Sequence, residues 1–408
     1  MGMNQTPASE RIHIGFFGKR NAGKSSVINA VTGQKLAIVS DVKGTTTDPV
    51  YKTMELLPLG PVMVIDTPGI DDLGELGALR VQKSYQVLNK TDIAVLVIDG
   101  TIGKTSQEDA LIQRFLAKGI PYLLVYNKVD LLPEEKQKEL LQNSSPEEIW
   151  VSASKNLHIQ ELKEKIAGKK PEDTHPFPII ADLIRPMDLV ALVVPVDKAA
   201  PKGRLILPQQ QTIRDILEAG ALSMVVRDTE LKETLARFQA QGLTPHMVVT
   251  DSQAFARVSQ DTPAEIPLTS FSILFARYKG DLETLVRGVA ALSHLKDGDR
   301  VLIAEGCTHH RQCNDIGTVK LPQWIRNYAK AEPVFSFTSG TEFPEDVSSY
   351  DMVVHCGGCM LNEREMKYRI ACCQDQGVPI TNYGILIAQV TGILKRSLEP
   401  FPEILKIL

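Results

Sequence analysis

The sequence predicts an α/β protein made of three consecutive domains, and three observations support this prediction. The chain has 408 residues, of which 43% are hydrophobic and 23% charged, enough for more than one folded core. Apolar strand-like runs alternate with helix-like segments, as expected for parallel sheets with crossover helices. The stretch GKKPEDTHPFP at 168–178 is rich in proline, glycine and charge and is typical of a linker.

The first predicted domain covers residues 1–170 and contains a mostly parallel sheet. Its apolar runs end in polar or glycine-containing segments, which marks the carboxyl ends of buried strands. The runs are IHIGFFG, VMVIDTPG, IAVLVIDG, YLLVYNKVD and EIWVSAS. A helix is expected at SSVINAV, after the glycine-containing loop that follows the first strand.

The second predicted domain, 178–263, is a small α/β unit, and the third, 264–408, is another. The second alternates three strands (LVALVVPVD, LSMVVRD, HMVVTD) with three helices. The third begins with the helix DLETLVRGVAALSHL and continues with the strands RVLIAEG, VFSFTSG, MVVHC and VPITNYG.

Composition disfavours several classes of protein. The net charge is -4 and the basic residues are scattered, so we expect no nucleic-acid partner. The longest apolar runs, such as AVLVI and LVALVVPV, are far shorter than the roughly 20 residues that span a bilayer, so we expect no membrane partner. All six cysteines follow residue 306, which suits a cytoplasmic protein with metal or redox chemistry better than a disulfide framework.

Residues 18–25, GKRNAGKS, form a P-loop motif between a predicted strand and a predicted helix. Backbone N–H groups and the helix N-terminus would hold phosphates, Lys24 would reach the β and γ oxygens, and Ser25 would bind Mg²⁺. The residues expected at the nucleotide here are Gly18, Asn21, Ala22, Gly23, Lys24, Ser25 and Ser26.

Two further motifs are expected around the γ-phosphate. In DTPG at 66–69, Asp66 would hold the magnesium shell through water and the Gly69 N–H would sense the phosphate. GTTTD at 44–48 supplies a threonine for Mg²⁺. We choose Thr46 by resemblance to GTPases with a GTTxD switch, with Thr45 as the alternative. Lys24, Thr46 and Gly69 are therefore the predicted catalytic residues.

NKVD at 127–130 and SAS at 152–154 predict guanine recognition. Asp130 would accept hydrogen bonds from the guanine N1–H and 2-amino groups, and Asn127 would contact the other edge of the base. The Ala153 N–H would point at O6, with Lys128 and Ser152 beside it. Adenine would leave these groups unpaired, so GTP is expected rather than ATP.

Two features of this domain concern hydrolysis. Ile70 follows DTPG, so the glutamine that orients water in Ras-like sites is absent there, and the acidic Asp71, Asp72 and Glu75 are the nearby alternatives. Asn21 together with GTTTD resembles the potassium-activated TrmE and Era-like GTPases. That resemblance implies K⁺ bound by Asn21 beside the phosphates.

Two cysteine groups follow two predicted strands, CTHH at 307–310 and HCGGC at 355–359. Parallel strands bring their carboxyl ends to one edge, so these groups are expected to converge. Cys307, Cys356 and Cys359 would suit an iron-sulfur cluster, or zinc with one histidine. The candidates for the fourth ligand are Glu305, His309, His310 and His355. A lone CGGC pair would instead suit a thiol oxidoreductase.

The P-loop domain, the middle domain and the pattern Cys-x-His followed by His-Cys-x-x-Cys together resemble the HydF family of FeFe-hydrogenase maturation GTPases. The matching positions are Cys307, His309, His355, Cys356 and Cys359. The resemblance implies a homodimer whose middle domain is the dimerisation domain. It also implies a 4Fe-4S cluster on the three cysteines, an open iron site carrying a di-iron precursor, and FeFe hydrogenase apoprotein and radical-SAM maturases as partners.

The remaining cysteines have smaller expected roles. Cys313 is an auxiliary candidate at the site, whereas Cys372 and Cys373 lie in a predicted helix and are expected to pack in the core. Two other functions stay open from the residues: a GTPase with a structural zinc domain that assists RNA or ribosome assembly, and a GTP-regulated thiol oxidoreductase.

Overall fold

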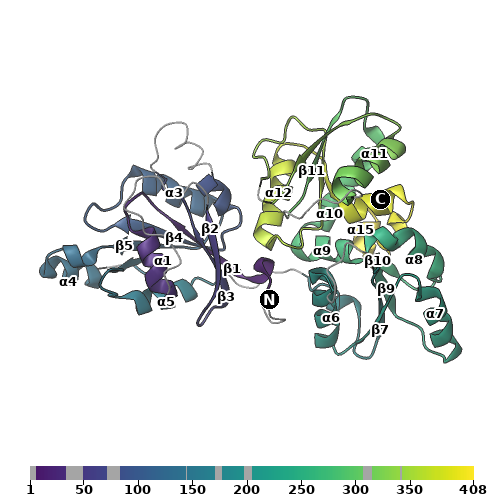
Figure 1. The fold of residues 1–408 in the computed structure, drawn as a ribbon, viewed down its shortest axis with the longest axis horizontal. Helices are drawn as coiled ribbons and strands as arrows, with labels where there is room; N and C mark the ends of the chain where they lie inside the picture. The colour runs from purple at the N-terminus through teal and green to yellow at the C-terminus, as the bar shows by residue number, and fades with distance from the viewer. Residues whose placement is uncertain are drawn as a thin grey trace. The chain divides into compact units, whose positions relative to one another are not determined.

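The computed structural model describes residues 6–33, 49–70, 83–143, 145–170, 177–196, 205–306, 315–340 and 342–408 (Figure 1). The chain divides into two compact units, Met1–Thr174 and His175–Leu408. Each unit is described by itself. Thr46, Asp71, Asp72, Glu75, Cys307, His309, His310 and Cys313 lie outside the described residues, as does Thr45.

The described part of the first unit forms one mixed sheet with strand order β2-β3-β1-β4-β5-β6. The strands are β1 (Ile12–Phe17), β2 (Val50–Leu56), β3 (Gly60–Asp66), β4 (Ile93–Asp99), β5 (Tyr122–Asn127) and β6 (Glu148–Trp150). Only β2 runs antiparallel to its neighbour within this sheet. The predicted mostly parallel sheet is confirmed, and β2 is a strand that the sequence prediction missed.

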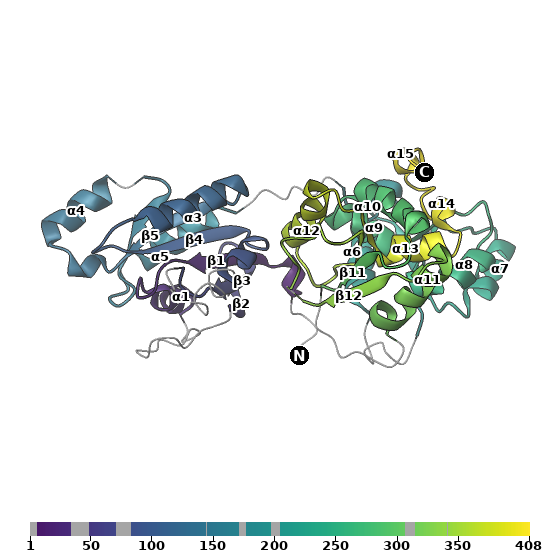
Figure 2. The same ribbon diagram turned by 90° about the horizontal axis from the view of Figure 1, so that it is seen from above.

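Helices cover both faces of this sheet because its central strands are apolar on both sides. The helices are α1 (Lys24–Thr32), α3 (Ser106–Ala117), α4 (Glu134–Gln142) and α5 (Ile159–Ala167). Helices α1 and α5 pack on the face that contains Phe16, whereas α3 packs on the face that contains Phe17. Figure 2 shows α1 and α3 on opposite sides of the sheet.

The described part of the second unit contains two all-parallel sheets, as predicted for two α/β domains. The first has the order β10-β9-β7-β8 and the second β12-β11-β13-β14. Their strands are β7 (Leu189–Val193), β8 (Leu222–Val226), β9 (Met247–Thr250), β10 (Leu268–Ser270), β11 (Arg300–Ala304), β12 (Val334–Thr338), β13 (Met352–His355) and β14 (Ile380–Asn382). The segment 178–263 contains β7 to β9, and β10, which completes their sheet, follows it.

Helices connect the strands of this unit and pack against its sheets. The described α-helices are α6 (Leu207–Glu218), α7 (Leu231–Ala240), α8 (Phe255–Asp261), α9 (Phe271–Lys279), α10 (Leu282–Val289), α11 (Leu321–Ala329), α12 (Glu363–Asp375), α13 (Tyr383–Val390), α14 (Leu394–Ser397) and α15 (Pro402–Leu405), with a π-helix at Ile316–Lys320 before α11. In the described residues, no helix is long and apolar enough to cross a membrane.

One hydrophobic core runs through both sheets of the second unit. It includes Val190 and Leu192 of β7, Phe271 of α9, and Leu302 of β11, all buried. The close approach of α10 to β14 requires a glycine, because a Cβ on Gly288 would lie 1.9 Å from the backbone oxygen of Ile380. The buried residues of this shared core, which come from both sheets, join the two sheets by packing.

Candidate functional site

The P-loop begins where β1 ends, and two of its glycines are required by close contacts. A Cβ on Gly18 would lie 2.2 Å from the oxygen of Val97, and one on Gly23 would lie 2.2 Å from Nδ2 of Asn127. Both glycines also have positive φ, as does the exposed Asn21 with φ 58°. The loop therefore lies against the carboxyl ends of β4 and β5, where nucleotides bind in α/β sheets.

Lys24 and Ser25 lie at the start of α1, where a phosphate and a metal ion would be held. The buried Lys24 Nζ donates to the carbonyl oxygens of Gly18 and Lys19, at 2.8 and 2.9 Å. Ser25 Oγ donates to Asp66 Oδ2 at 3.0 Å. Burial raises the pKa of Asp66, while Lys24 and Ser25 oppose this effect. A hydroxyl and a desolvated carboxylate form a set of hard oxygen ligands that fits Mg²⁺.

DTPG continues from β3 directly beside the P-loop. Thr67 Oγ1 donates to the Phe16 carbonyl at 2.7 Å, and the Ile70 N–H donates to the Gly18 carbonyl at 3.4 Å. The Ile70 side chain is buried in the core beside α3. It therefore offers no polar group to a water at the γ-phosphate position, and Gly69 lies between these two anchored residues.

The predicted base-recognition motifs meet the P-loop through Asn127. Its Nδ2 donates to the Ala22 carbonyl and its Oδ1 accepts from the Ala153 N–H, both at 3.1 Å. Lys128, with φ 67°, pairs with Asp99 at 2.5 Å. Asp99 belongs to none of the sequence motifs, although its place at the end of β4, beside Asn127, marks it as a candidate for this edge of the sheet. Burial would raise the pKa of Asp99, but hydrogen bonds from Lys128 and Thr101 lower it overall.

Asp130 is buried at one oxygen and lacks a partner there. Its Oδ2 accepts a long hydrogen bond of 3.4 Å from Ser154 Oγ, whereas Oδ1 is buried and has no partner among the described residues. Ser152 is fully buried and its Oγ accepts from the Lys155 N–H at 3.1 Å, which shapes the loop around Ala153. An unpaired buried acceptor is costly, and a guanine edge would supply the missing donors.

The two predicted cysteine groups follow neighbouring strands, β11 and β13. The Cys356 N–H donates to the Ala304 carbonyl at 2.9 Å, which extends the pairing of these strands. The Gly306 N–H then donates to Cys356 Sγ at 3.0 Å. Gly306 directly precedes Cys307, so the expected meeting of the two strand ends is confirmed as far as the described residues reach. Among these residues, no three metal-binding side chains are grouped together.

The loop after β13 supplies a second backbone donor to the sulfur of Cys356. Cys356 Sγ also accepts from the Gly358 N–H at 3.4 Å, and backbone N–H donors of this kind are typical of cysteines that bind iron-sulfur clusters. Gly358 has φ +62°, and a Cβ there would lie 2.5 Å from Met366 Sδ. Cys356 and Cys359 are free and partly buried. The donor set thus fits a thiolate-bound metal group.

Burial raises the thiol pKa of both Cys356 and Cys359. Next to Cys359, the buried Lys279 at the end of α9 lowers the pKa of this thiol in opposition to burial. Lys279 Nζ donates to the Leu361 carbonyl at 3.2 Å. Lys279 could not be identified from the sequence, because a buried lysine at the end of an amphipathic helix has the same local pattern as a solvated one.

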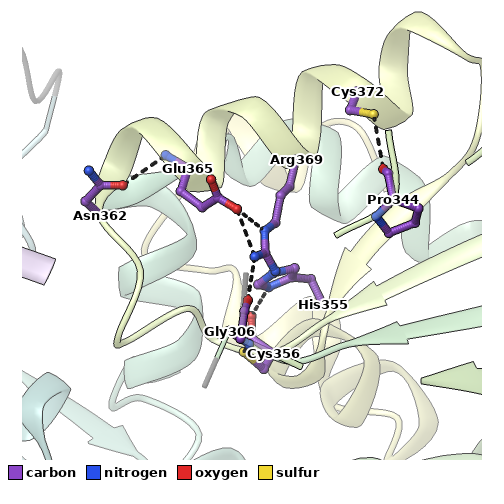
Figure 3. A network of polar contacts seen from close by, with 9 residues as sticks. Gly306, Pro344, His355, Cys356, Asn362, Glu365, Arg369 and Cys372 are labelled. Atoms are coloured by element: carbon purple, nitrogen blue, oxygen red, sulfur yellow. Dashed lines mark hydrogen bonds and ion pairs between the residues drawn. The ribbon is translucent and has the colours of Figure 1, made fainter. Parts of the chain in front are cut away.

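His355 ends β13 and is fully buried, and both of its ring nitrogens have protein partners. Nδ1 lies 2.6 Å from the Cys356 carbonyl oxygen, and Nε2 lies 2.9 Å from Nη1 of Arg369 (Figure 3). Burial first and Arg369 second lower the pKa of His355 to about 3, so the ring is neutral. Arg369, which also donates to Glu365, belongs to none of the sequence motifs.

Glu305, another predicted candidate for the fourth ligand, is buried at the end of β11. Its Oε1 accepts from the Tyr383 hydroxyl at 3.3 Å. Burial and the nearby Glu305 carboxylate raise the pKa of Tyr383, which stays protonated. A Cβ on Gly317 would lie 2.4 Å from the same carboxylate oxygen, so this glycine makes room for Glu305.

Cys372 and Cys373 belong to the hydrophobic core, as predicted. Both are buried in α12, and Cys372 Sγ lies 3.3 Å from the Glu345 carbonyl oxygen. Burial raises the pKa of Cys373 to about 12, so this thiol stays protonated.

Protein-family models match three parts of the chain. Residues 13–128 match the model described as 50S ribosome-binding GTPase. Residues 179–280 match the hydrogen maturase F dimerization domain, and residues 283–400 match the hydrogen maturase F tetramerization domain.

Curated relatives and solved structures each resemble part of the chain. GTPase Der of Kosmotoga olearia is 32% identical over 171 residues, which cover 38% of each chain. The tRNA modification GTPase MnmE of Hydrogenovibrio crunogenus is 30% identical over 158 residues, 38% of this chain and 34% of that protein. The chain thus spans little more than a third of the length of these relatives. The crystal structure of a variant of Aquifex aeolicus Era bound to GDP and AlF₄⁻ aligns with a TM-score of 0.35 and 22% identity over 53% of this chain and 92% of that one.

The mixed sheet with its P-loop agrees with the GTPase model, and the two parallel sheets agree with the two maturase models. Together the two hydrogen maturase F models match more than half of the chain. The protein is therefore a member of the hydrogen maturase F family, HydF.

Proposed function

We propose that this protein is a GTPase and a metal-cluster carrier in the maturation of FeFe hydrogenase. It binds and hydrolyses GTP in its first unit, holds a 4Fe-4S cluster in its second, and carries a di-iron precursor as cargo to the hydrogenase apoprotein. Family membership supports the pathway. The observation that carries the cluster assignment is the hydrogen bond from the Gly306 N–H, next to Cys307, to Cys356 Sγ.

The GTP assignment is supported by the guanine-side geometry. Asn127 connects the P-loop to Ala153, and the buried Asp130 Oδ1 lacks a donor that guanine would provide. Lys24 would neutralise phosphate charge, while Ser25, Asp66 and Thr46 would hold Mg²⁺, which supplies further positive charge at the phosphates. The backbone N–H of Gly69 would sense the γ-phosphate. Asn21 would bind K⁺, which raises the rate of hydrolysis.

In the second unit, Cys307, Cys356 and Cys359 would hold the cluster, leaving one iron without a cysteine ligand. The bound cluster supplies an iron site that accepts an exogenous ligand or a bridge to the cargo. Gly306 and Gly358 direct their N–H groups at Cys356, which stabilises its thiolate form. Radical-SAM maturases are the proposed source of the di-iron cargo.

A thiol oxidoreductase is less well supported by the same loop. Reactive CxxC motifs place a cysteine at a helix N-terminus, which lowers its pKa. Here α12 begins at Glu363 with Asn362 as its N-cap, beyond Cys359, and burial raises the pKa of both thiols. Zinc bound by the same cysteines is the other possible result of the metal measurement described below.

Self-association is proposed through the middle sheet. Strand β8 forms one edge of this sheet and exposes Leu222 and Val225, at 46% and 45%. An exposed apolar edge offers unpaired backbone groups to another strand, and a second copy would cover it. The match of 179–280 to a dimerization domain supports this assignment.

The testing experiment is iron and sulfide analysis with electron paramagnetic resonance on anaerobically prepared protein, followed by activation of hydrogenase apoprotein. We expect about four iron and four sulfide per chain, GTP turnover, and activation that requires loaded protein. One zinc per chain without sulfide would contradict the cluster assignment. A cluster-loaded protein that never activates the apoprotein would contradict the carrier role.

A further inference from the structure

Arg369 is the largest fully buried side chain described in the structure, and it lies beside the proposed cluster loop. It extends from α12 toward the end of β13, where Figure 3 shows it between Glu365 and His355. Its Nε donates to Glu365 Oε1 at 2.9 Å and its Nη2 to the Gly340 carbonyl at 2.8 Å. Its Nη1 lies 2.9 Å from His355 Nε2.

The bond to His355 fixes the position of the ring proton. A guanidinium group can only donate hydrogen bonds, so Nε2 of His355 must be the acceptor. The proton of the neutral ring is then on Nδ1, which donates to the Cys356 carbonyl at 2.6 Å. The result is a continuous chain of hydrogen bonds from Glu365 through Arg369 and His355 to Cys356.

This arrangement removes the nitrogen through which His355 could bind iron. A neutral imidazole has one available lone pair, and here it faces Arg369. Turning the ring toward the cluster would leave an N–H of Arg369 without its acceptor, and this side chain is only 1% exposed. Such a loss around a buried charge is strongly unfavourable.

We propose that Arg369 is a positioning residue that keeps His355 from ligating the cluster and makes it a support for the Cys356 backbone. The inference rests on the proposed cluster and deepens it. Because both ring nitrogens of His355 are engaged in this way, His355 does not fill the fourth iron position. Glu365, which is only 4% exposed, balances the charge of Arg369 and sets its orientation.

The first experiment measures the tautomer of His355 in protein without metal. In full-length protein labelled with ¹⁵N-histidine, long-range ¹H–¹⁵N spectra should show His355 protonated at Nδ1, assigned with His355→Asn. Arg369→Gln should change this signal. Lys367→Gln is the matched control, because it removes an exposed cation paired with Glu363 on the same helix. A His355 ring protonated at Nε2 would overturn the inference.

The second experiment uses the reconstituted cluster. Outer partners of metal ligands typically contribute 10- to 100-fold to metal affinity, so Arg369→Gln and His355→Leu should each release iron to a chelator about tenfold faster. The double variant should be no faster than either single one, and Arg369→Lys should recover part of the loss. His355→Asn, whose amide can still donate to Cys356, should retain iron better than His355→Leu. If the double variant instead released iron faster than either single variant by the combined effect of both, Arg369 and His355 would act independently and the inference would be wrong.

Pulsed electron paramagnetic resonance on ¹⁵N-histidine protein shows whether His355 binds the iron directly or only supports the Cys356 backbone. The parent should show no directly bound imidazole nitrogen from His355. A strong nitrogen coupling that disappears in His355→Asn would make His355 a ligand and overturn the inference while leaving the cluster assignment intact. Protein that binds no iron would instead overturn the proposed function. Circular dichroism checks folding, and Glu365→Gln serves as a milder variant where Arg369→Gln unfolds.

Discussion

Ser154 holds Asp130 by only one carboxylate oxygen, through a hydrogen bond of 3.4 Å from Oγ to Oδ2. The other oxygen, Oδ1, is buried and has no partner in the described part of the chain. In the proposed GTP site, this unpaired oxygen would accept from the guanine N1–H and 2-amino groups.

Asp130→Asn should therefore weaken GDP and GTP binding by about 2 kcal/mol or more, roughly 30-fold, because a charged acceptor is replaced by an amide. The amide would donate to a 2-oxo group, so xanthosine diphosphate should bind better than it does to the parent. Calorimetric titration with GDP and with xanthosine diphosphate measures this change in base preference. Ser154→Ala, the control, should have a much smaller effect, and equal GDP affinity in Asp130→Asn would contradict the assignment.

The side chain of Asn21 should control the response to potassium. Replacing Na⁺ by K⁺ is expected to raise the GTPase rate of the parent several-fold, since K⁺ would add positive charge at the phosphates. Asn21→Ala should abolish this difference. Because Asn21 has φ 58°, Asn21→Gly is a better matched variant that keeps the backbone and removes only the side chain. Identical parent rates in the two salts would show that no such cation site operates.

The cysteines should divide into two groups on mutation to serine. Cys307→Ser, Cys356→Ser and Cys359→Ser are each expected to lose cluster and hydrogenase activation while GTP turnover persists, because the proposed nucleotide site lies in the other compact unit. Cys372→Ser and Cys373→Ser should keep their iron, with some loss of stability from the buried hydroxyl. Iron content and spectra are the measurements. A Cys356→Ser protein with its full spectrum would refute the ligand set.

Asp99 should give the first unit an acid-sensitive contribution to stability. Its folded-state pKa is lowered, so the favourable pairing with Lys128 is present above the ordinary aspartate pKa of 3.8 and is lost as the pH falls through the lower folded-state value. Asp99→Asn should lower stability at neutral pH and have little effect at strongly acidic pH. Urea unfolding of parent and variant over this pH range tests the sign, which a pH-independent difference would contradict.

Gly288→Ala should destabilise the second unit. The added Cβ would lie 1.9 Å from the backbone oxygen of Ile380, so α10 would have to move away from β14. Overpacking of this kind costs about 1–3 kcal/mol or more. Thermal unfolding measures the loss. Gly298→Ala adds a Cβ in open space and is the control for extra volume, although its φ of +85° adds some local strain.

The sequence predicted the long buried strands and the motifs at their ends because hydrophobic runs and P-loop spacing are local signals. It did not predict β2, whose side chains are mostly exposed, or β10, which has three residues. Both depend on a neighbouring strand for their pairing, and local propensity carries little of that information. These two edge strands, one in the first sheet and one in the middle sheet, were therefore less predictable than the central strands.

For the candidate sites, residues inside a motif could be predicted and their supports could not. Glu365 and Arg369 have the i, i+4 spacing of an exposed helical ion pair, yet both are buried. The contact of Arg369 with His355 arises only in the tertiary fold. The same is true of Asp130, where Ser154 donates to Oδ2 and leaves Oδ1 without a partner among the described residues. The roles of Lys279 and Asp99 likewise depend on contacts distant in sequence.

The core shared by the two parallel sheets has a consequence for how the chain can be divided experimentally. Arg396 of α14 donates to the carbonyls of Ser259, Thr262 and Pro263, which adds polar contacts to the common packing. The residues from 179 to the end of α15 should thus open as a single cooperative unit in hydrogen exchange. A truncated fragment starting at residue 264 would expose the apolar surface that packs against the middle sheet and would aggregate, so cluster chemistry is best studied with both sheets together.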